Sequence, residues 1–430
     1  MVSAKRSEYC LAGMVLALAS AGLGFAQPGY PGPFTCNASA DPHPIRKEGA
    51  AELVSDIYLT CTGGVPLPSG APINLSTVKI QMDAPITSRL VSANLSEALL
   101  IIDDAYPAHP NPASAPRPAG AGSPQNVCPD SVGGCPMNAN GNPSGAPGGE
   151  YDGTDQHYNV FQGYPVGGNA VAFTVPLDAP GTSPLTMRIT NIRVNASQQV
   201  SPFPLIPIHA YVSTLGQPLL SNPQPTVANA TRGMSFAQTP AVPAAGTSYS
   251  TLSATFTEGF STSFKTWIDY RNPGPENVPG FPYSTESGLW DTSATPGGLP
   301  AAGLANHGTR LMLHFTGYKP GIHIVAPSAA YLGGDTAAGI QVTGAIMYVA
   351  TDANGNSAGG PKASASKSVT ITTDSQGNGW LTYEVVWSDA STIETVRIPM
   401  LIESSSTGAV TGSFGPLVSG PAILIPRFID

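Results

Sequence analysis

The amino-acid sequence predicts an all-β protein made of two immunoglobulin-like antiparallel β-sandwich domains with long loops rich in proline and glycine. Three observations predict this class. Short stretches of alternating apolar and polar residues recur along the chain, separated by Gly, Pro, Asn and Asp. Glycine (48 residues) and proline (44 residues) are abundant but not periodic, which is typical of many turns. No stretch of ten residues has the periodicity of a helix.

The first 26 residues have the pattern of a secretory signal peptide. Lys5 and Arg6 precede an apolar stretch, 11–24, which is too short and too rich in small residues for a good membrane span. We expect cleavage after Ala26, and therefore a secreted protein found outside the cell or at its surface. No later apolar stretch reaches membrane length.

The charge of the chain narrows the possible functions. Charged residues make up 10% of it, against roughly 25% in ordinary domains, so Ser, Thr, Asn and Gln must supply much of the polar surface. The net charge of −9 argues against binding of nucleic acid by a basic surface. No hydrolase, zinc-protease, P-loop or dinucleotide-binding motif is present. We therefore expect no enzyme, no catalytic residues and no cofactor.

The first domain is expected at residues 51–220, after a proline-rich arm and first strand at 27–50. Residues 51–62 alternate with period two, which is typical of a half-buried strand. Further strands are expected at 73–83, 98–102, 169–175, 185–194 and 203–213.

Three of these strands carry additional predictions. The stretch 98–102 is wholly apolar and should be buried on both faces. The alternation in 185–194 changes parity, which predicts a β-bulge near Thr190 and Asn191. The proline-rich stretch 203–213 is expected to be an edge strand that closes the domain.

Four cysteines remain after removal of the signal peptide: Cys36, Cys61, Cys128 and Cys135. An even number in an exported chain indicates disulfides. We expect Cys36 to pair with Cys61, which lies on the apolar face of the 51–62 strand. We expect Cys128 to pair with Cys135, because they flank a Gly-Gly turn within a long insert, 103–157. The two other pairings remain open.

A stretch rich in Pro, Ala and Thr, 221–246, is expected to link the first domain to a second one at 247–430. Phe256, Phe260 and Phe264 are expected to seed its core. Seven short alternating strands are typical of an immunoglobulin-like sandwich. They are expected at 309–315, 321–326, 340–350, 368–373, 380–387, 395–402 and 421–429.

Seven segments lie in a recurring order along most of the chain: LVSDIYLTCTGG, SEALLIIDD, NVFQG, ITNIRVNAS, FTEGFSTSFKT, GTRLMLHF and PRFID. Together they resemble a family of secreted, largely uncharacterised β-sandwich proteins of acidobacterial type. The segments are strands and turns, so the resemblance implies a fold and no active site. The insert around Cys128 and Cys135 is where this chain departs from that layout. More loosely, a proline-rich arm before sandwich domains is similar to subunits of extracellular fibres.

These features favour a secreted structural or adhesive protein that binds itself or other cell-surface components. In a self-assembling version, the arm would add a strand to a neighbouring subunit and form a filament. The arm residues that would make this contact are Gln27, Pro28, Tyr30, Pro31 and Phe34. The more ordinary interpretation of the arm is a disordered leader into the first strand, and it ranks ahead of the donor strand.

The alternative function is a carbohydrate-binding surface module in which loop aromatics stack on the sugar rings of a polysaccharide. The candidates are Tyr151, Tyr158, Tyr164, Tyr283 and Trp290. Scattered exposed aromatics are ordinary on protein surfaces, so this hypothesis ranks second. Five N-x-S/T sequons are candidate glycosylation sites: Asn37, Asn74, Asn94, Asn195 and Asn229.

The sequence indicates metal sites only weakly. His314 and His323 flank a turn that would place them opposite each other, but two ligands without a nearby carboxylate or thiol make a poor site. The loops at Asp352 and Asp374 resemble the first half of a calcium loop but lack its later bidentate Glu. We therefore expect hairpin turns there and no metal site.

Overall fold

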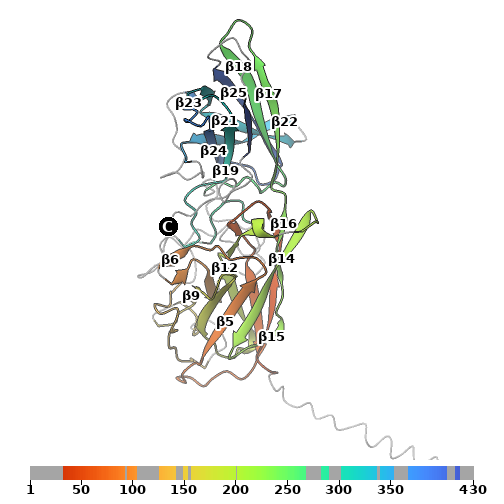
Figure 1. Ribbon diagram of the computed structural model, residues 1–430. Helices are drawn as coiled ribbons and strands as arrows, with labels where there is room; N and C mark the ends of the chain where they lie inside the picture. Colours follow the sequence, from red (N-terminus) through yellow and green to blue (C-terminus); the bar gives the residue numbers. More distant parts are fainter. Residues whose placement is uncertain are drawn as a thin grey trace, which may run out of the picture.

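The computed structural model describes residues 32–92, 94–103, 125–141, 149–153, 156–199, 201–267, 282–289, 302–336, 339–352, 367–403 and 412–416. In these residues every regular element is a β-strand except one 3₁₀ turn, Ala196–Gln198 (η1). The buried apolar side chains form two large cores, one within residues 34–230 and one within 234–414. The strands around them form two sandwiches placed end to end (Figure 1). The prediction of an all-β sandwich protein is confirmed.

Two six-stranded sheets enclose the first core, with the orders β15-β1-β4-β12-β8-β9 and β10-β11-β5-β14-β16-β2. The first sheet contains β1 (Thr35–Ala40), β4 (Ile57–Gly63), β8 (Leu99–Ile102), β9 (Val160–Gln162), β12 (Gly181–Thr190) and β15 (Leu219–Asn222). The second contains β2 (His43–Arg46), β5 (Leu75–Met82), β10 (Tyr164–Pro165), β11 (Ala170–Pro176), β14 (Leu205–Leu215) and β16 (Thr226–Thr231). Two short antiparallel pairs join β3 (Glu52–Leu53) to β13 (Arg193–Val194) and β6 (Leu90–Ser92) to β7 (Leu95–Ser96).

Strand β1 corrects the prediction of a free assembly arm. It pairs with β4 on one side and with β15 on the other. Phe34, directly before β1, is 7% exposed and belongs to the first core. Phe34 is therefore not free to enter a neighbouring subunit, because its own sandwich already buries it. Gln27, Pro28, Tyr30 and Pro31 lie outside the described residues.

Both disulfides have the predicted pairing. Cys36 and Cys61 are direct partners in the β1–β4 register, so this bond links neighbouring strands of one sheet. The Cys128–Cys135 bond closes a turn within the described part of the insert. A Cβ added at Gly134 would lie 2.8 Å from the side chains of Leu75 and Thr174, so this turn packs directly on the first domain.

Strand β8 is buried on both faces, as its wholly apolar sequence predicts. Leu100 and Ile102 point into the first core. On the opposite face, Leu99 and Ile101 pack in a small separate cluster that includes Leu289. The second face is therefore covered by a residue almost two hundred positions away in the chain, which no local pattern could indicate.

Two predictions about strand continuity need correction. The chain does not bulge near Thr190 but breaks there, because Asn191 has a φ of +61° and β13 starts only at Arg193. Strand β14 is not an edge strand, since its first half pairs with β16 and its second half with β5. Pro207 lies in the first half, which has a neighbour on one side only, and there a missing N–H is tolerated.

The second core lies inside a ten-stranded sheet that folds over on itself, in the order β17-β18-β25-β21-β22-β24-β19-β26, with β20 beside β25 and β23 beside β20. The sheet folds at β25, which pairs with β21 through Glu394 and Thr395 and with β20 through Leu401 and Ile402. The strands are β17 (Met234–Pro243), β18 (Tyr249–Glu258), β19 (Arg310–Thr316), β20 (His323–Pro327), β21 (Ala329–Thr336), β22 (Gly339–Val349), β23 (Ser368–Thr372), β24 (Gly379–Trp387), β25 (Glu394–Glu403) and β26 (Ser413–Pro416).

The prediction of a linker at 221–246 is wrong. This stretch contains all of β16 and β17, and the chain crosses from one core to the other at Arg232 and Gly233. Its prolines suggested a linker, but Pro240 and Pro243 lie in β17, an edge strand that can accommodate them. Of the three predicted core phenylalanines, Phe256 and Phe264 are buried and Phe260 is half-buried. The expected strand 421–429 lies outside the described residues.

Candidate binding groove and the joint between the domains

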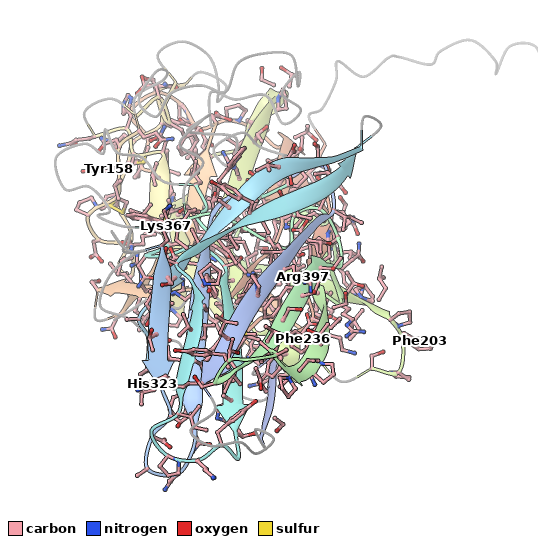
Figure 2. The ribbon with its side chains drawn as sticks, turned by 90° about the horizontal axis from the view of Figure 1, so that it is seen from above. Tyr158, Phe203, Phe236, His323, Lys367 and Arg397 are labelled. Carbon is pink, nitrogen blue, oxygen red and sulfur yellow. A yellow bond between two sulfur atoms is a disulfide. The ribbon has the colours of Figure 1, made fainter. Side chains whose placement is uncertain are left out.

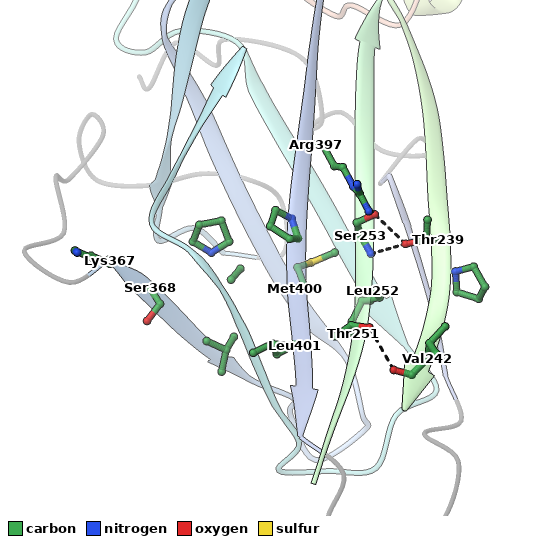
Figure 3. A pocket seen from close by; sticks show the side chains of 15 residues that line it. Thr239, Val242, Thr251, Leu252, Ser253, Lys367, Ser368, Arg397, Met400 and Leu401 are labelled. Atoms are coloured by element: carbon green, nitrogen blue, oxygen red, sulfur yellow. Dashed lines mark hydrogen bonds between the residues drawn. The ribbon is translucent and has the colours of Figure 1, made fainter. Parts of the chain in front are cut away.

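A groove lies on the outer face of the layer formed by β17, β18, β25, β20 and β23 (Figure 3). Its volume is about 560 Å³, which is in the range of protein binding sites. The lining residues are Thr239, Pro240, Val242, Thr251, Leu252, Ser253, Val325, Ala326, Pro327, Lys367, Ser368, Arg397, Pro399, Met400 and Leu401.

Period-two alternation places apolar side chains on this outer face. Along β25, alternate residues are buried in the second core, and Arg397, Pro399 and Leu401 between them face outward. Leu401 is 39% exposed and Val242 of β17 is 57% exposed. Leu401 is the register partner of Thr251 on β18. The floor of the groove is therefore apolar, with hydroxyl groups beside it.

The Arg397 side chain is held by a chain of hydrogen bonds across the groove (Figure 3). Its Nε donates to Ser253 Oγ at 3.2 Å. The hydroxyls of Ser253 and Thr239 share a hydrogen bond of 2.8 Å, and the Ser253 backbone N–H donates to Thr239 Oγ1 at 2.8 Å. Ser253 is only 2% exposed, so it forms a fixed support beneath the guanidinium. Neither Nη group of Arg397 has a hydrogen-bond partner in the described part of the chain.

The groove is positively charged in an acidic protein. Arg397 lies on β25, and Lys367 lies beyond it, next to the start of β23 (Figures 2 and 3). Both are exposed, and neither forms an ion pair within the described part of the chain. Among the described residues that line the groove, none is acidic and none is aromatic. This local charge contrasts with the net charge of −9.

The two histidines considered for a metal site are not neighbours. His314 lies on β19, which pairs with β24 and β26, and its ring stacks on Trp380 with centroids 5.3 Å apart. His323 lies on β20, which pairs with β23 and β25, and its Nδ1 contacts Thr372 Oγ1 at 2.9 Å. The turn between them does not form a hairpin, so the two side chains are not placed opposite each other.

The loop at Asp374 forms a turn but not the predicted hairpin, because its flanking strands do not pair: β23 pairs with β20, and β24 pairs with β19 and β22. Asp374 Oδ1 accepts hydrogen bonds of 2.8 Å from the backbone N–H groups of Gln376 and Asn378. Gly377 has a φ of +81°. The loop after Asp352 lies outside the described residues. The described residues contain no group of three or more His, Cys, Asp or Glu side chains that could hold a metal ion.

Two of the five aromatics proposed for sugar stacking are buried and cannot bind a sugar ring. Tyr151 and Tyr283 are each 2% exposed and make hydrogen bonds inside the protein. Tyr158 and Tyr164 are half-buried, and Trp290 lies outside the described residues. The prediction of an exposed set of stacking rings is therefore wrong for Tyr151 and Tyr283.

The five sequons lie on or near the surface. Asn37, Asn74 and Asn94 are exposed, and Asn195 and Asn229 are half-buried. Their glycosylation stays a prediction.

The two domains meet at a buried network of charged residues, which we call the joint. Arg46, at the end of β2, contacts Glu52 of its own domain at 2.6 Å and Glu286 of the second half of the chain at 2.9 Å. Its Nη1 also donates to Thr309 Oγ1 at 2.7 Å and to the carbonyl oxygen of Ser263 at 3.2 Å. All three charged side chains are at most 2% exposed.

Residues 282–289 lie against the first domain and extend the joint. Tyr283 Oη donates to Asp56 Oδ1 at 2.7 Å, and Arg188 Nε donates to the other oxygen of Asp56 at 2.7 Å. Asn191 Nδ2 donates to the carbonyl oxygen of Leu289 at 2.7 Å. Arg193 Nη2 donates to the carbonyl oxygen of Glu286. Each of these contacts connects residues about a hundred or more positions apart in the chain.

Burial and neighbouring charges act against each other in the joint. Burial disfavours the charged form of Arg46, but Glu286 and Glu52 more than compensate and raise its pKa above its usual range. Burial also disfavours ionised Glu52, but Arg46 and Lys265 lower the Glu52 pKa. Burial lowers the pKa of Lys265. Arg46 and Glu52 are thus both charged inside the protein.

Two further buried carboxyl groups, those of Glu258 and Glu394, lie near the start of β25. Glu258 Oε1 accepts a hydrogen bond of 2.6 Å from the Phe264 N–H, and Glu258 Oε2 accepts one of 2.9 Å from the Glu394 N–H. Burial raises the pKa of Glu258 to about 8 and that of Glu394 to about 7. Both groups therefore favour the protonated form well above the pH at which exposed carboxyls ionise.

Comparisons with known proteins leave the family open. No protein-family model and no curated protein matches the chain. Among solved structures, the C-terminal domain of the Streptococcus agalactiae AgI/II polypeptide BspA aligns with 8% sequence identity and a TM-score of 0.29, over 89% of this chain and 96% of that one. A TM-score this low carries no argument about function. In the described residues no helix has the length and hydrophobicity needed to cross a membrane.

The sequence patterns did not single out the groove residues. A usable signal was present in TVRIPMLIE, where a strand that is buried on one face carries Arg397, Pro399 and Leu401 on the other. An exposed proline and leucine in a strand paired on both sides indicate a candidate contact surface. Thr239 and Ser253 gave no such signal, because their role depends on the β17–β18 register.

Proposed function

We propose that this chain is an extracellular adhesive protein and that the groove of the second domain is its contact surface. The observation that carries the proposal is the groove itself. It combines an open apolar floor with two exposed cations that have no ion-pair partner in the described part of the chain. Such a combination of apolar centre and arginine is typical of protein contact surfaces.

Two further observations support the proposal. The disulfides Cys36–Cys61 and Cys128–Cys135 are typical of proteins exported to an oxidising compartment. The domains also lie end to end, with β15 near one end and the β17–β18 hairpin at the other (Figure 1). Because β15 pairs with β1, the N-terminal strand and the groove lie in opposite domains. This arrangement suits a protein that presents a binding surface away from its N-terminal end.

A cell-binding assay tests the proposal. The fluorescently labelled mature chain, 27–430, is incubated with intact cells of the source organism and measured by flow cytometry. A double variant, Val242→Asp with Leu401→Asp, places charge on the groove floor. We expect it to reduce binding at least about tenfold.

The matched control is Val342→Asp, which alters an exposed valine (56%) of the same domain outside the groove. It should bind like the unmodified chain. Absence of cell binding by the unmodified chain would overturn the adhesive role. Full binding by the double variant would show that the contact surface lies elsewhere.

A further inference from the structure

We infer that the partner segment that occupies the groove is an extended peptide with apolar side chains and a carboxylate that binds Arg397. This inference rests on the proposed function and specifies the chemistry of the partner. Three features of the groove lead to it: the orientation of Arg397, the length of the groove and the composition of its floor.

The carboxylate is indicated by the way Arg397 is held. Its Nε donates to Ser253, and the two Nη groups on the other edge of the planar guanidinium have no partner in the described part of the chain. A guanidinium fixed in this way is pre-organised for a carboxylate, which can accept two parallel hydrogen bonds. No carboxylate of the described chain occupies this position, because Arg397 has no ion pair there. Lys367 adds a second positive charge on the far side of β25 (Figure 3).

The extended shape follows from the length of the groove. Its lining comes from five neighbouring strands, β17, β18, β25, β20 and β23. At roughly 4.8 Å between strands, these span about 19 Å, which is the length of about six residues of extended chain.

The floor favours a peptide over an acidic polysaccharide. Its exposed apolar surface comes from Val242, Pro399 and Leu401, and no aromatic ring is among the described lining residues. Sugar rings usually stack on aromatic side chains, whereas aliphatic and proline side chains are matched by aliphatic side chains of a peptide. Thr239 and Ser253 are positioning residues, since they act through Arg397.

Peptide binding to the full mature chain tests the inference. The probes are three labelled eight-residue peptides of Val, Pro and Leu that differ only in a central Glu, Gln or Lys, with polygalacturonate as the polysaccharide probe. Fluorescence anisotropy gives the Kd. We expect the Glu peptide to bind at least about tenfold more tightly than the Gln peptide, and the Lys peptide to bind most weakly.

Variants separate a binding role of Arg397 from a structural one. Arg397→Gln should remove the preference for Glu over Gln while leaving the Kd of the Gln peptide unchanged. Ser253→Ala keeps the arginine but loses its support, and should reduce the preference only in part. Lys319→Gln, which removes an exposed cation outside the groove, should have no effect.

The outcomes distinguish this inference from the proposed function. Equal affinity for the Glu and Gln peptides would overturn the role of Arg397 in carboxylate binding. If polygalacturonate binds and none of the three peptides does, the inference of a peptide partner is wrong and the partner is a polysaccharide. If no probe binds while cell binding still depends on Val242 and Leu401, the partner chemistry is wrong but the adhesive function stands.

Discussion

Arg46 of the first domain and Glu286 of the second half of the chain form an ion pair of 2.9 Å, with both side chains at most 2% exposed. Arg46 simultaneously contacts Glu52 at 2.6 Å. An arginine shared by two buried carboxylates connects the domains in a way that water cannot easily replace, because each partner would be left as an unpaired buried charge. We therefore expect the joint to couple the unfolding of the two sandwiches.

Arg46→Met tests this coupling. Methionine fills much of the space but leaves Glu52 and Glu286 buried without their counter-ion, so we expect a loss of about 3–5 kcal/mol in the free energy of unfolding. Calorimetry should show one transition for the unmodified chain and two for the variant. Lys47→Met is the control, because the Lys47 side chain makes a single hydrogen bond within the described part of the chain, to the carbonyl oxygen of Ser201. An unchanged single transition in Arg46→Met would refute the coupling.

The stability of the protein should fall as the pH rises from 5 to 9. Burial raises the folded-state pKa of Glu258 to about 8 and that of Glu394 to about 7, above the unfolded value of 4.5. The contribution of these two protonated groups to the free energy of unfolding is therefore complete below pH 4.5. It is lost as the pH rises through 7 and 8. Urea denaturation at pH 5, 7 and 9 should show a decrease on the order of 2–4 kcal/mol.

Glu258→Gln provides the check on that pH dependence. The amide cannot ionise, so the decrease in the free energy of unfolding between pH 5 and pH 9 should become clearly smaller. An identical pH profile for Glu258→Gln and the unmodified chain would exclude Glu258 as the cause.

His43 should affect stability at acidic pH. Burial lowers its pKa to about 4, so its contribution to stability is present above pH 6.5 and is lost as the pH falls toward 4.

The two disulfides should differ in their contribution to stability. The cysteines of the Cys36–Cys61 bond are 25 positions apart in the chain, and those of the Cys128–Cys135 bond are 7 positions apart. Because the entropy removed from the unfolded chain grows with loop length, replacing both cysteines by serine should cost about 3–4 kcal/mol for the first pair and about 2–3 kcal/mol for the second. Urea denaturation of the two double variants measures this order, and the opposite order would contradict it.

Gly377→Ala should destabilise the second domain more than Gly321→Ala. Both glycines have a positive φ, +81° and +79°, which favours glycine. A Cβ at Gly377 would lie 1.8 Å from the Tyr318 carbonyl oxygen, whereas a Cβ at Gly321 would meet nothing within 4 Å. Thermal unfolding should therefore show a loss of roughly 1 kcal/mol for Gly321→Ala and of at least about 3 kcal/mol for Gly377→Ala. Equal losses would show that the backbone shifts to relieve the contact.

Local patterns predicted the strands well where alternation was regular. The buried strand β8, the Phe256 and Phe264 core positions and both cysteine pairs could be recognised from short segments. The stretch 221–246 resembles an irregular linker because proline is usually excluded from strands. Strand β17 can contain prolines only because it lies at the edge of its sheet.

The sequence by itself determined the all-β class and favoured the two disulfide pairs that form, because strand period and turn residues are local properties of the chain. Only the tertiary structure decided which distant strands lie side by side. That arrangement places Ser253 and Thr239 under Arg397, brings Glu286 to Arg46, and buries Tyr283 instead of exposing it. These contacts join residues up to about 240 positions apart, and a local sequence period contains no information about such separations.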